Sequence, residues 1–164
     1  MKPTEHLYQS VVSTPVGVIT LQANDHQVIA IHFGSLSGSK QSNDHIHHLE
    51  NWLAEYFDGK DVEFDHPIGV EGTRFQQAVW DLIRRIPRGY VTTYQSIANH
   101  LNKPTCARAV GQAVARNPLP IVIPCHRVLG KNGQLTGYIG GLAIKEKLLE
   151  LEKASFQKQI IFPS

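Results

Sequence analysis

The proline-rich segment at residues 117–130, NPLPIVIPCHRVLG, constrains the fold of this chain more than any other stretch. Prolines at positions 118, 120 and 124 bracket its apolar run. A proline has no N–H to donate to a neighbouring strand, so this run is not expected to form an ordinary central strand. We expect instead a rigid, irregular backbone that holds Cys125 at a defined place.

Cys125 is followed directly by His126, and the two residue types together can supply a nucleophile and its base. Neighbouring side chains on an extended chain point to opposite faces, so a direct contact would need a bend. The economical alternative is a relay in which a water molecule joins His126 to the thiol. The nearby cations Arg127 and Lys131 predict a lowered thiol pKa. A cysteine that only packs in the core is the competing interpretation.

The last expected helix, residues 141–153, supplies a carboxylate for this relay. Leu148, Leu149 and Glu152 share one face of it, which places Glu152 on the apolar side, where an unpaired carboxylate is costly. A histidine partner would satisfy Glu152 and complete a Cys/His/Glu arrangement. The alternative is that Glu152 reaches solvent near the end of the helix.

Three further helices are expected in the second half of the chain. Thr73 and Gln76 form a capping box for a helix at about residues 74–86, which Pro87 ends. Two short helices follow, at about 94–101 and 105–116, the second capped by Thr105, with only the residues NKP between them. So tight a break predicts a helix-turn-helix.

The second helix of this pair has two different faces. Cys106 is expected to face inward as a small core residue. Arg108, Gln112 and Arg116 form an outward row at i, i+4 and i+8, flanked by small residues that let a partner approach the backbone. This pattern suits a helix that enters a nucleic-acid groove. A solvated helix face with an incidental arginine row is the alternative.

Charge divides the chain into opposite halves. Residues 1–69 contain 3 lysines and 9 acidic residues, a formal charge of −6, whereas residues 70–164 contain 13 basic and 5 acidic residues, a formal charge of +8. A basic half of this kind is typical of a nucleic-acid-binding domain, although a basic surface without a ligand fits equally well. We therefore predict an N-terminal structural domain at 1–69 and a binding domain at 70–164.

The N-terminal domain is expected to be an antiparallel meander, YQSVVST, VITLQ and QVIAIHF, followed by a helix near residues 45–57. We interpret DHIHH at 44–48 as the solvated start of that helix and expect no metal site. With 2 cysteines in the chain, a disulfide between Cys106 and Cys125 is not expected. Nothing in this half resembles a catalytic site.

Several function classes are disfavoured by what the sequence lacks. There is no apolar stretch of the roughly 18 to 20 residues that span a membrane and no signal sequence, so we expect a cytoplasmic protein without a membrane partner. Neither a G-x-G-x-x-G motif nor a P-loop is present, so no nucleotide or methyl-donor cofactor is expected.

These motifs together resemble the O6-alkylguanine-DNA alkyltransferases, also called methylated-DNA–protein-cysteine methyltransferases. The resemblance covers about residues 72–153 and lies in PCHRV, ARAVGQAVARNPLPIVI, FQQAVWDLIRRIPRGYVTTYQSIA and GYIGGLAIKEKLLELE. It implies an α+β fold, with a small strand-rich, ribonuclease-H-like N-terminal domain. The C-terminal domain is then helical and winged-helix-like, with a helix-turn-helix.

The family also implies an activity, the irreversible repair of DNA. One alkyl group moves from O6 of guanine, and by extension O4 of thymine, in duplex DNA to Cys125, and each molecule acts once. The base is flipped out through the minor groove. The damaged DNA is both partner and donor, so no cofactor is implied. We expect a monomer in solution, with cooperative binding to DNA left open.

The resemblance assigns roles to the residues nearest the chemistry. Cys125 resembles the nucleophile, His126 the water-mediated base and Glu152 the carboxylate that orients the base. Asn117 resembles the residue that ties the active-site turn to the helix-turn-helix. Arg108 resembles the finger that fills the space of the flipped base.

The resemblance assigns further residues to the DNA and the base. The Tyr94 hydroxyl would meet the flipped guanine and help to rotate its phosphate. Many members have serine where this chain has Ile139, which leaves a main-chain N–H donor to O6 but puts the preference among alkyl groups in doubt. The remaining expected contacts are the backbone carbonyls of Cys125 and Val128 to the exocyclic amine, Pro120 and Tyr138 as walls of the alkyl pocket, and Thr105, Gln112 and Arg116 to DNA.

Three other functions compete with this one. A non-enzymatic relative that reads alkylated DNA usually has tryptophan at the position of Cys125. A cysteine hydrolase would use Cys125 and His126 but would not explain the arginine row. A transcription regulator would use the helix-turn-helix and would need no cysteine.

Overall fold

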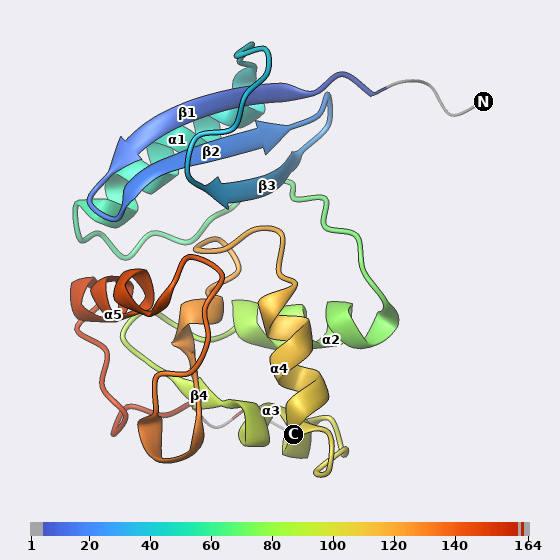
Figure 1. Ribbon diagram of the computed structural model, residues 1–164, viewed down its shortest axis with the longest axis vertical. Helices are drawn as coiled ribbons and strands as arrows, with labels where there is room; N and C mark the ends of the chain where they lie inside the picture. The colour runs from blue at the N-terminus through green and yellow to red at the C-terminus, as the bar shows by residue number, and fades with distance from the viewer. Residues whose placement is uncertain (1–4, 161, 163–164) are drawn as a thin grey trace. The chain divides into compact units, whose positions relative to one another are not determined.

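The computed structural model describes residues 5–160 and 162, and the chain divides into two compact units, residues 1–70 and 71–164 (Figure 1). The predicted domains 1–69 and 70–164 also include residues 1–4, 161 and 163–164, which lie outside the described residues. Each unit has its own apolar core. The combination of a strand-rich first unit and a helical second unit confirms the predicted α+β class.

The first unit is a meander covered by one helix. Strands β1 (Tyr8–Thr14), β2 (Gly17–Ala23) and β3 (Val28–Phe33) form an antiparallel sheet in the order β1-β2-β3, as predicted. Helix α1 (Asp44–Phe57) lies along one face of the sheet (Figure 1). The side chain of Asn43 caps the helix. Its buried residues Ile46, Leu49, Leu53 and Tyr56 complete the core with Ile19, Leu21 and Ile31.

Two histidines at the solvated start of α1 also contact His66. His45 Nδ1 lies 2.6 Å from His66 Nε2, and the His48 ring stacks on that of His66 at a centroid distance of 4.3 Å. The interpretation of DHIHH as the solvated start of the helix is confirmed, because Asp44, His47 and His48 are exposed and His45 is half-buried. Within residues 5–160 and 162, no group of three or more His, Cys, Asp or Glu side chains could hold a metal ion.

The second unit begins with the helix that the capping box predicts. In α2 (Arg74–Arg84), the Thr73 side chain accepts from the Gln76 N–H and the Gln76 side chain accepts from the Thr73 N–H, which confirms the box. Trp80 is buried and donates from Nε1 to the Ala113 carbonyl at 2.9 Å, which fastens α2 to the later helix α4 (Ala107–Ala115).

The helix-turn-helix consists of α3 (Tyr94–His100) and α4, and their connection is longer than predicted. Asn102 adopts a left-handed φ of 57° just after α3, and α4 begins only at Ala107. Thr105 therefore does not cap α4, contrary to prediction. Cys106 is the N-cap and gives no side-chain hydrogen bond, and it is half-buried rather than a core residue.

The second unit ends with a short sheet and one more helix. Strand β4 (Thr92–Thr93) pairs in parallel with β5 (Val128–Leu129), so that the entry to α3 lies beside the segment that follows Cys125. Helix α5 (Leu142–Leu151) follows, with Glu152 as its C-cap. None of the helices in the described part of the chain is long and apolar enough to cross a membrane.

Candidate active site

The proline-bracketed segment forms the turn that carries Cys125. As predicted, it is not a central strand: residues 118–124 are irregular, and Cys125–Arg127 is a single 3-10 turn that leads into β5. Cys125 and His126 thus lie on a tight turn and not on an extended chain. The assumption that their side chains point to opposite faces of an extended chain is therefore wrong.

The backbone of this turn is strained and held from both sides. Ile121, a buried β-branched residue, has a φ of 74°, a conformation that costs on the order of 1 to 3 kcal/mol. The Ile123 N–H donates to the Leu119 carbonyl at 2.9 Å. Asn117, buried just after α4, donates to the Ile123 carbonyl at 2.8 Å and accepts from the Leu119 N–H at 2.9 Å. Asn117, which directly follows the C-cap of α4, therefore braces the segment that leads to Cys125.

His126 and Glu152 form a buried pair. His126 Nε2 lies 2.6 Å from Glu152 Oε1, and both side chains are shielded from solvent. Glu152 therefore does not reach solvent, which decides between the two interpretations of its position. Arg127 also binds this carboxylate, through Nε at 2.9 Å and Nη2 at 2.8 Å, and its Nη1 donates to the Ile86 carbonyl.

The pair fixes which nitrogen of His126 can act as a base. Burial opposes ionisation of Glu152, but His126 and Arg127 outweigh it and lower the pKa of its carboxyl. A carboxylate only accepts, so His126 Nε2 carries the proton and Nδ1 keeps a lone pair. Burial lowers the pKa of His126 despite Glu152, so the ring is neutral at neutral pH. Among the described residues, the buried Nδ1 has no hydrogen-bond partner.

Cys125 is buried and its thiol is neutral at rest. Burial raises its pKa to about 11, while Asn117, the charge of Lys145 and Tyr138 act in the opposite direction. The expectation of a lowered thiol pKa is therefore wrong. Arg127 is engaged by Glu152, and Lys131 is exposed, so neither offsets the desolvation. Cys125 and Cys106 are both free thiols.

Sequence reasoning missed Lys145. This residue of α5 is fully buried, and its Nζ donates to the Val128 carbonyl at 2.8 Å and to the Thr136 carbonyl at 3.0 Å. Burial lowers its pKa to about 8, although the Cys125 charge acts to raise it. The signal was available, because Lys145 precedes Leu148, Leu149 and Glu152 at helical spacing on the same apolar face.

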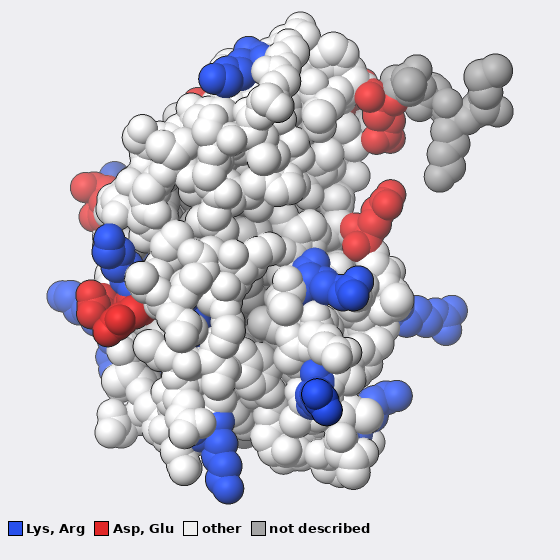
Figure 2. All heavy atoms as spheres, viewed as in Figure 1, with Lys and Arg blue, Asp and Glu red and all other residues white. Residues whose placement is uncertain are grey.

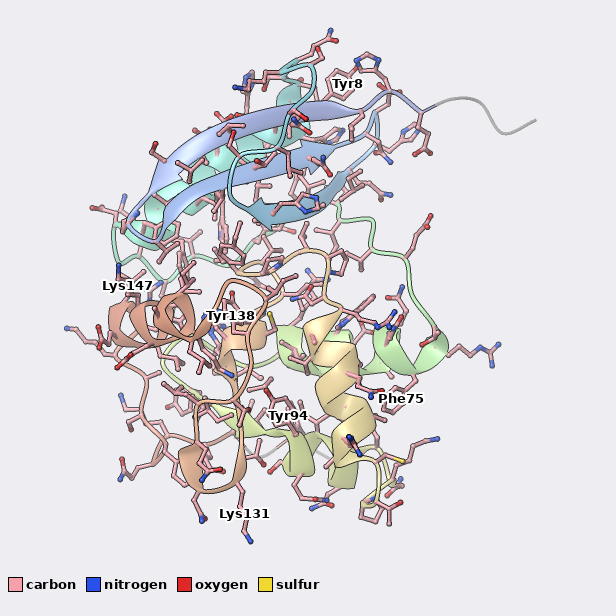
Figure 3. All side chains as sticks on the ribbon, in the orientation of Figure 1. Tyr8, Phe75, Tyr94, Lys131, Tyr138 and Lys147 are labelled. Carbon is pink, nitrogen blue, oxygen red and sulfur yellow. The ribbon has the colours of Figure 1, made fainter. Side chains whose placement is uncertain are left out.

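Two tyrosines border the thiol-bearing turn (Figure 3). Tyr94, half-buried at the start of α3, accepts at its hydroxyl from Thr136 Oγ1 at 3.2 Å, and burial is the main cause that raises its pKa. A side chain at Gly111 would meet the Tyr94 ring at 3.8 Å. Tyr138 acts to lower the pKa of the Cys125 thiol. Beside Tyr94 opens a cleft of about 640 Å³, lined by Thr93, Tyr94, Gln95, Ala107, Lys131 and Asn132.

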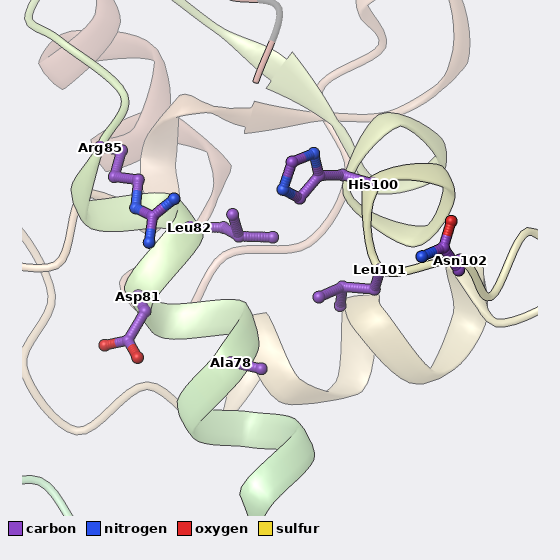
Figure 4. A pocket seen from close by; sticks show the side chains of 7 residues that line it. All are labelled: Ala78, Asp81, Leu82, Arg85, His100, Leu101 and Asn102. Atoms are coloured by element: carbon purple, nitrogen blue, oxygen red, sulfur yellow. The ribbon is translucent and has the colours of Figure 1, made fainter. Parts of the chain in front are cut away.

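A second cleft lies apart from the thiol. Its volume is about 410 Å³, and it is lined by Ala78, Asp81, Leu82 and Arg85 near the end of α2 and by His100, Leu101 and Asn102 at the end of α3 (Figure 4). It contains none of the predicted site residues. The carboxylate of Asp81 and the guanidinium of Arg85 carry opposite charges, so the cleft has no uniform positive charge that would attract a phosphate.

The remaining predicted site residues are not all brought to the thiol. Pro120 and Val128 are buried in the same turn, and the Val128 carbonyl already accepts from Lys145. Ile139 is 55% exposed and so is not packed in the core. Thr105, Arg108, Gln112 and Arg116 are exposed on and beside α4, as predicted for the row. Basic side chains are spread over this part of the surface (Figure 2).

Two family models match the sequence. Residues 7–70 match the ribonuclease-like domain of 6-O-methylguanine DNA methyltransferase, and residues 74–154 match its DNA binding domain. The methylated-DNA–protein-cysteine methyltransferase of Methanosarcina barkeri is 42% identical over 156 residues, which covers 90% of this chain and 98% of the relative. The constitutive enzyme of Bacillus subtilis is 36% identical over 163 residues, 93% of this chain and 99% of the relative.

Solved structures give the same result. The O6-methylguanine methyltransferase of Mycobacterium tuberculosis superposes with a TM-score of 0.81 at 35% identity, covering 90% of this chain and 93% of that one. A structure of the methyltransferase from that organism in complex with DNA has a TM-score of 0.82 at 37% identity, covering 89% and 92%.

Proposed function

The chain belongs to the 6-O-methylguanine DNA methyltransferase family and repairs DNA by transfer of an alkyl group to a cysteine of its own, and we propose that this cysteine is Cys125. One observation carries the assignment. Cys125 is buried on the turn next to a His126–Glu152 pair whose Nδ1 is free to accept a proton. Cys106 is half-buried at the N-cap of α4, where its backbone bonds to Lys103 and Val110.

The transfer needs a proton to leave the thiol. We propose that the proton passes through a water molecule to His126 Nδ1, where the imidazolium is stabilised by the carboxylate of Glu152. The thiolate then attacks the alkyl carbon, a C–S bond forms, and the C–O6 bond breaks. Its electron pair stays on the guanine, which takes up one proton, so the thiol proton is balanced. The thioether has no route back to a thiol, so each molecule reacts once.

The alkyl group of a stacked base is not open to attack in line with the C–O6 bond, so the nucleotide must leave the duplex at a cost of a few kcal/mol. We propose that Arg108 fills the space it vacates and that Tyr94 contacts the flipped nucleotide. The exposed row of Arg108, Gln112 and Arg116 supports this, as does the position of Tyr94 between α4 and Thr136. Entry from the minor groove, with Thr105 as a further DNA contact, belongs to the same proposal.

We propose that the pocket for the flipped base is formed around the turn that carries Cys125. Pro120 and Tyr138 wall the alkyl group, and the carbonyls of Cys125 and Val128 accept from the exocyclic amine. The main-chain N–H of Ile139 donates to O6. The burial of Pro120 and the influence of Tyr138 on the thiol pKa support this arrangement. O4-methylthymine is proposed as a second substrate, to be tested with a duplex that contains it.

The intact mass of the protein after incubation with a duplex that contains O6-methylguanine tests this proposal. We expect one added methyl group per chain, mapped to Cys125, absent in Cys125→Ser and retained in Cys106→Ser. An unchanged mass with DNA binding intact would instead favour a non-enzymatic reader of damaged DNA.

Arg108 is tested separately by comparing two substrates. Arg108→Ala should slow repair of the duplex while transfer from the free O6-alkylguanine base keeps its rate, because the free base needs no flipping. Equal losses on both substrates would contradict the finger role.

We also propose a monomer in solution and a cytoplasmic location. Light scattering of the free protein and of its complex with duplexes of increasing length would test the monomer and any cooperative binding. Fractionation of cells would test the location.

A further inference from the structure

Lys145 is a buried cation that is not paired with a carboxylate of the described residues. It is fully buried in α5, and in the part of the chain that the structure describes no carboxylate lies within ion-pair distance of it. Burying an ammonium without a counter-charge is costly, so lysine is seldom fully buried without a partner. A negative charge close to the ammonium would stabilise it, and no carboxylate of the described residues supplies that charge in the resting protein.

The hydrogen bonds of Lys145 place it at the turn that carries the nucleophile. Nζ donates to the Val128 carbonyl, and the Val128 N–H in turn closes the 3-10 turn by donating to the Cys125 carbonyl. The second bond, to the Thr136 carbonyl, holds the loop whose Thr136 hydroxyl reaches Tyr94. Lys145 thus fastens the thiol-bearing turn to the loop opposite it. Two of its three N–H groups are used in this way.

We infer that Lys145 is a positioning residue of the alkyl transfer, whose ammonium is the counter-charge of the Cys125 thiolate that forms during the reaction. This rests on the proposed function of Cys125. Among the described residues, Lys145 is the one cation whose charge acts on the thiol, since Arg127 is held by Glu152 and Lys131 is exposed. His126 removes the thiol proton and Lys145 keeps the resulting anion stable in a buried place.

The electrostatic coupling of the two groups supports this role. Burial is the largest influence on each, and it raises the pKa of Cys125 and lowers that of Lys145. The charge of Lys145 opposes the first shift, and that of Cys125 opposes the second. The other titratable groups around them are His126 in the same turn, Tyr94 of α3 and Tyr138 of the loop. Among these groups, Lys145 is the only one that carries a positive charge at rest.

The pH dependence of transfer from the free O6-alkylguanine base tests the role of Lys145. An opposite charge nearby shifts a pKa by about 1 to 3 units, so Lys145→Met should lower the rate at neutral pH by about 10-fold or more and move the midpoint of the profile to higher pH by at least about one unit. Lys145→Arg should keep the midpoint. Lys147→Met, an exposed lysine of the same helix, should change neither (Figure 3).

A purely structural lysine would give a different result. Lys145→Met would then be slower or less stable with the midpoint unmoved, and that result would overturn the inference. Lys145→Gln keeps donors for the two carbonyls without the charge, so its midpoint decides the question if the methionine variant does not fold. Alkylation of Cys125 in the wild-type protein by damaged duplex tests the proposed function alone. A failure of that function can therefore be told apart from a failure of the inferred role of Lys145.

Discussion

At the scale of single residues, the three groups around Cys125 have different tasks that follow from their contacts. Glu152 fixes the His126 tautomer at 2.6 Å, Arg127 shares that carboxylate, and Lys145 donates to the Val128 carbonyl just after the turn. The thiol is protected at rest because burial keeps it protonated, with a pKa of about 11. A thiol that stays protonated in the resting protein is consistent with the proposed role of Cys125 as a nucleophile that is used once.

Replacing Glu152 tests the orientation of the base. Glu152→Gln removes the carboxylate charge that holds the proton on His126 Nε2 and leaves the Arg127 guanidinium without its counter-charge. Transfer from free O6-alkylguanine should slow by about 100-fold or more, since a positioned general base contributes about 10²- to 10⁴-fold. Unfolding by urea should show a loss of about 3 kcal/mol, because a buried charge loses its partner. Glu150→Gln, at an exposed position of α5, should leave both measurements unchanged.

The buried ionisable pair also predicts acid sensitivity. The pKa of His126 is lowered in the folded protein, so the unfolded chain binds more protons, and stability is lost as pH falls below the ordinary histidine pKa of about 6.5. The lowered pKa of Glu152 adds a further loss below about pH 4.3. Urea unfolding between pH 5 and pH 8 measures the first loss.

The histidine variant is the control for this pH dependence. His126→Gln should flatten the dependence between pH 5 and pH 7, and His66, whose pKa is lowered by burial and by His48 and His45, should account for part of what remains. A wild-type protein with constant stability over this range would contradict the assignment of a neutral, buried His126.

At the scale of elements, the predicted cap of α2 by Thr73 is present, whereas the predicted cap of α4 by Thr105 is not. Thr73→Ala removes a capping box and should destabilise the protein by about 1 kcal/mol, whereas Thr105→Ala should have little effect, because α4 begins at Ala107 without a side-chain cap. Urea unfolding of the two variants makes the comparison directly. Equal destabilisation by both would show that Thr105 caps α4 after all.

At the scale of the whole molecule, the opposite charges of residues 1–69 and 70–164 predict how DNA binding depends on salt. Each phosphate neutralised in duplex DNA contributes about 0.9 to the slope of log affinity against log salt. Arg116→Ala should therefore reduce the slope by about 1, and Lys40→Ala in the acidic half should leave it unchanged. Fluorescence anisotropy across a salt series measures both slopes. Binding that does not respond to salt would contradict the proposal that basic side chains of residues 70–164 contact the DNA phosphates.

The sequence by itself determined the local elements and the chemical types at the site. Prolines argued against a central strand at residues 117–124, Thr73 and Gln76 predicted the start of α2, and the apolar face of the last helix indicated a partner for Glu152, with a solvated carboxylate as the alternative. These features depend on backbone donors and side-chain periodicity within a few residues, which the sequence contains. Its resemblance to the family supplied the activity, which the matches to known relatives bear out.

Only the tertiary structure decided the state of the thiol and the partners of the charged groups. Arg127 and Lys131 are close to Cys125 in sequence, yet one binds Glu152 and the other is exposed, while the cation that influences the thiol, Lys145, comes from α5, 20 positions along the chain. A pKa depends on burial and on distances in space. Those distances are fixed when α5 packs against the Cys125 turn, and sequence neighbours do not report them.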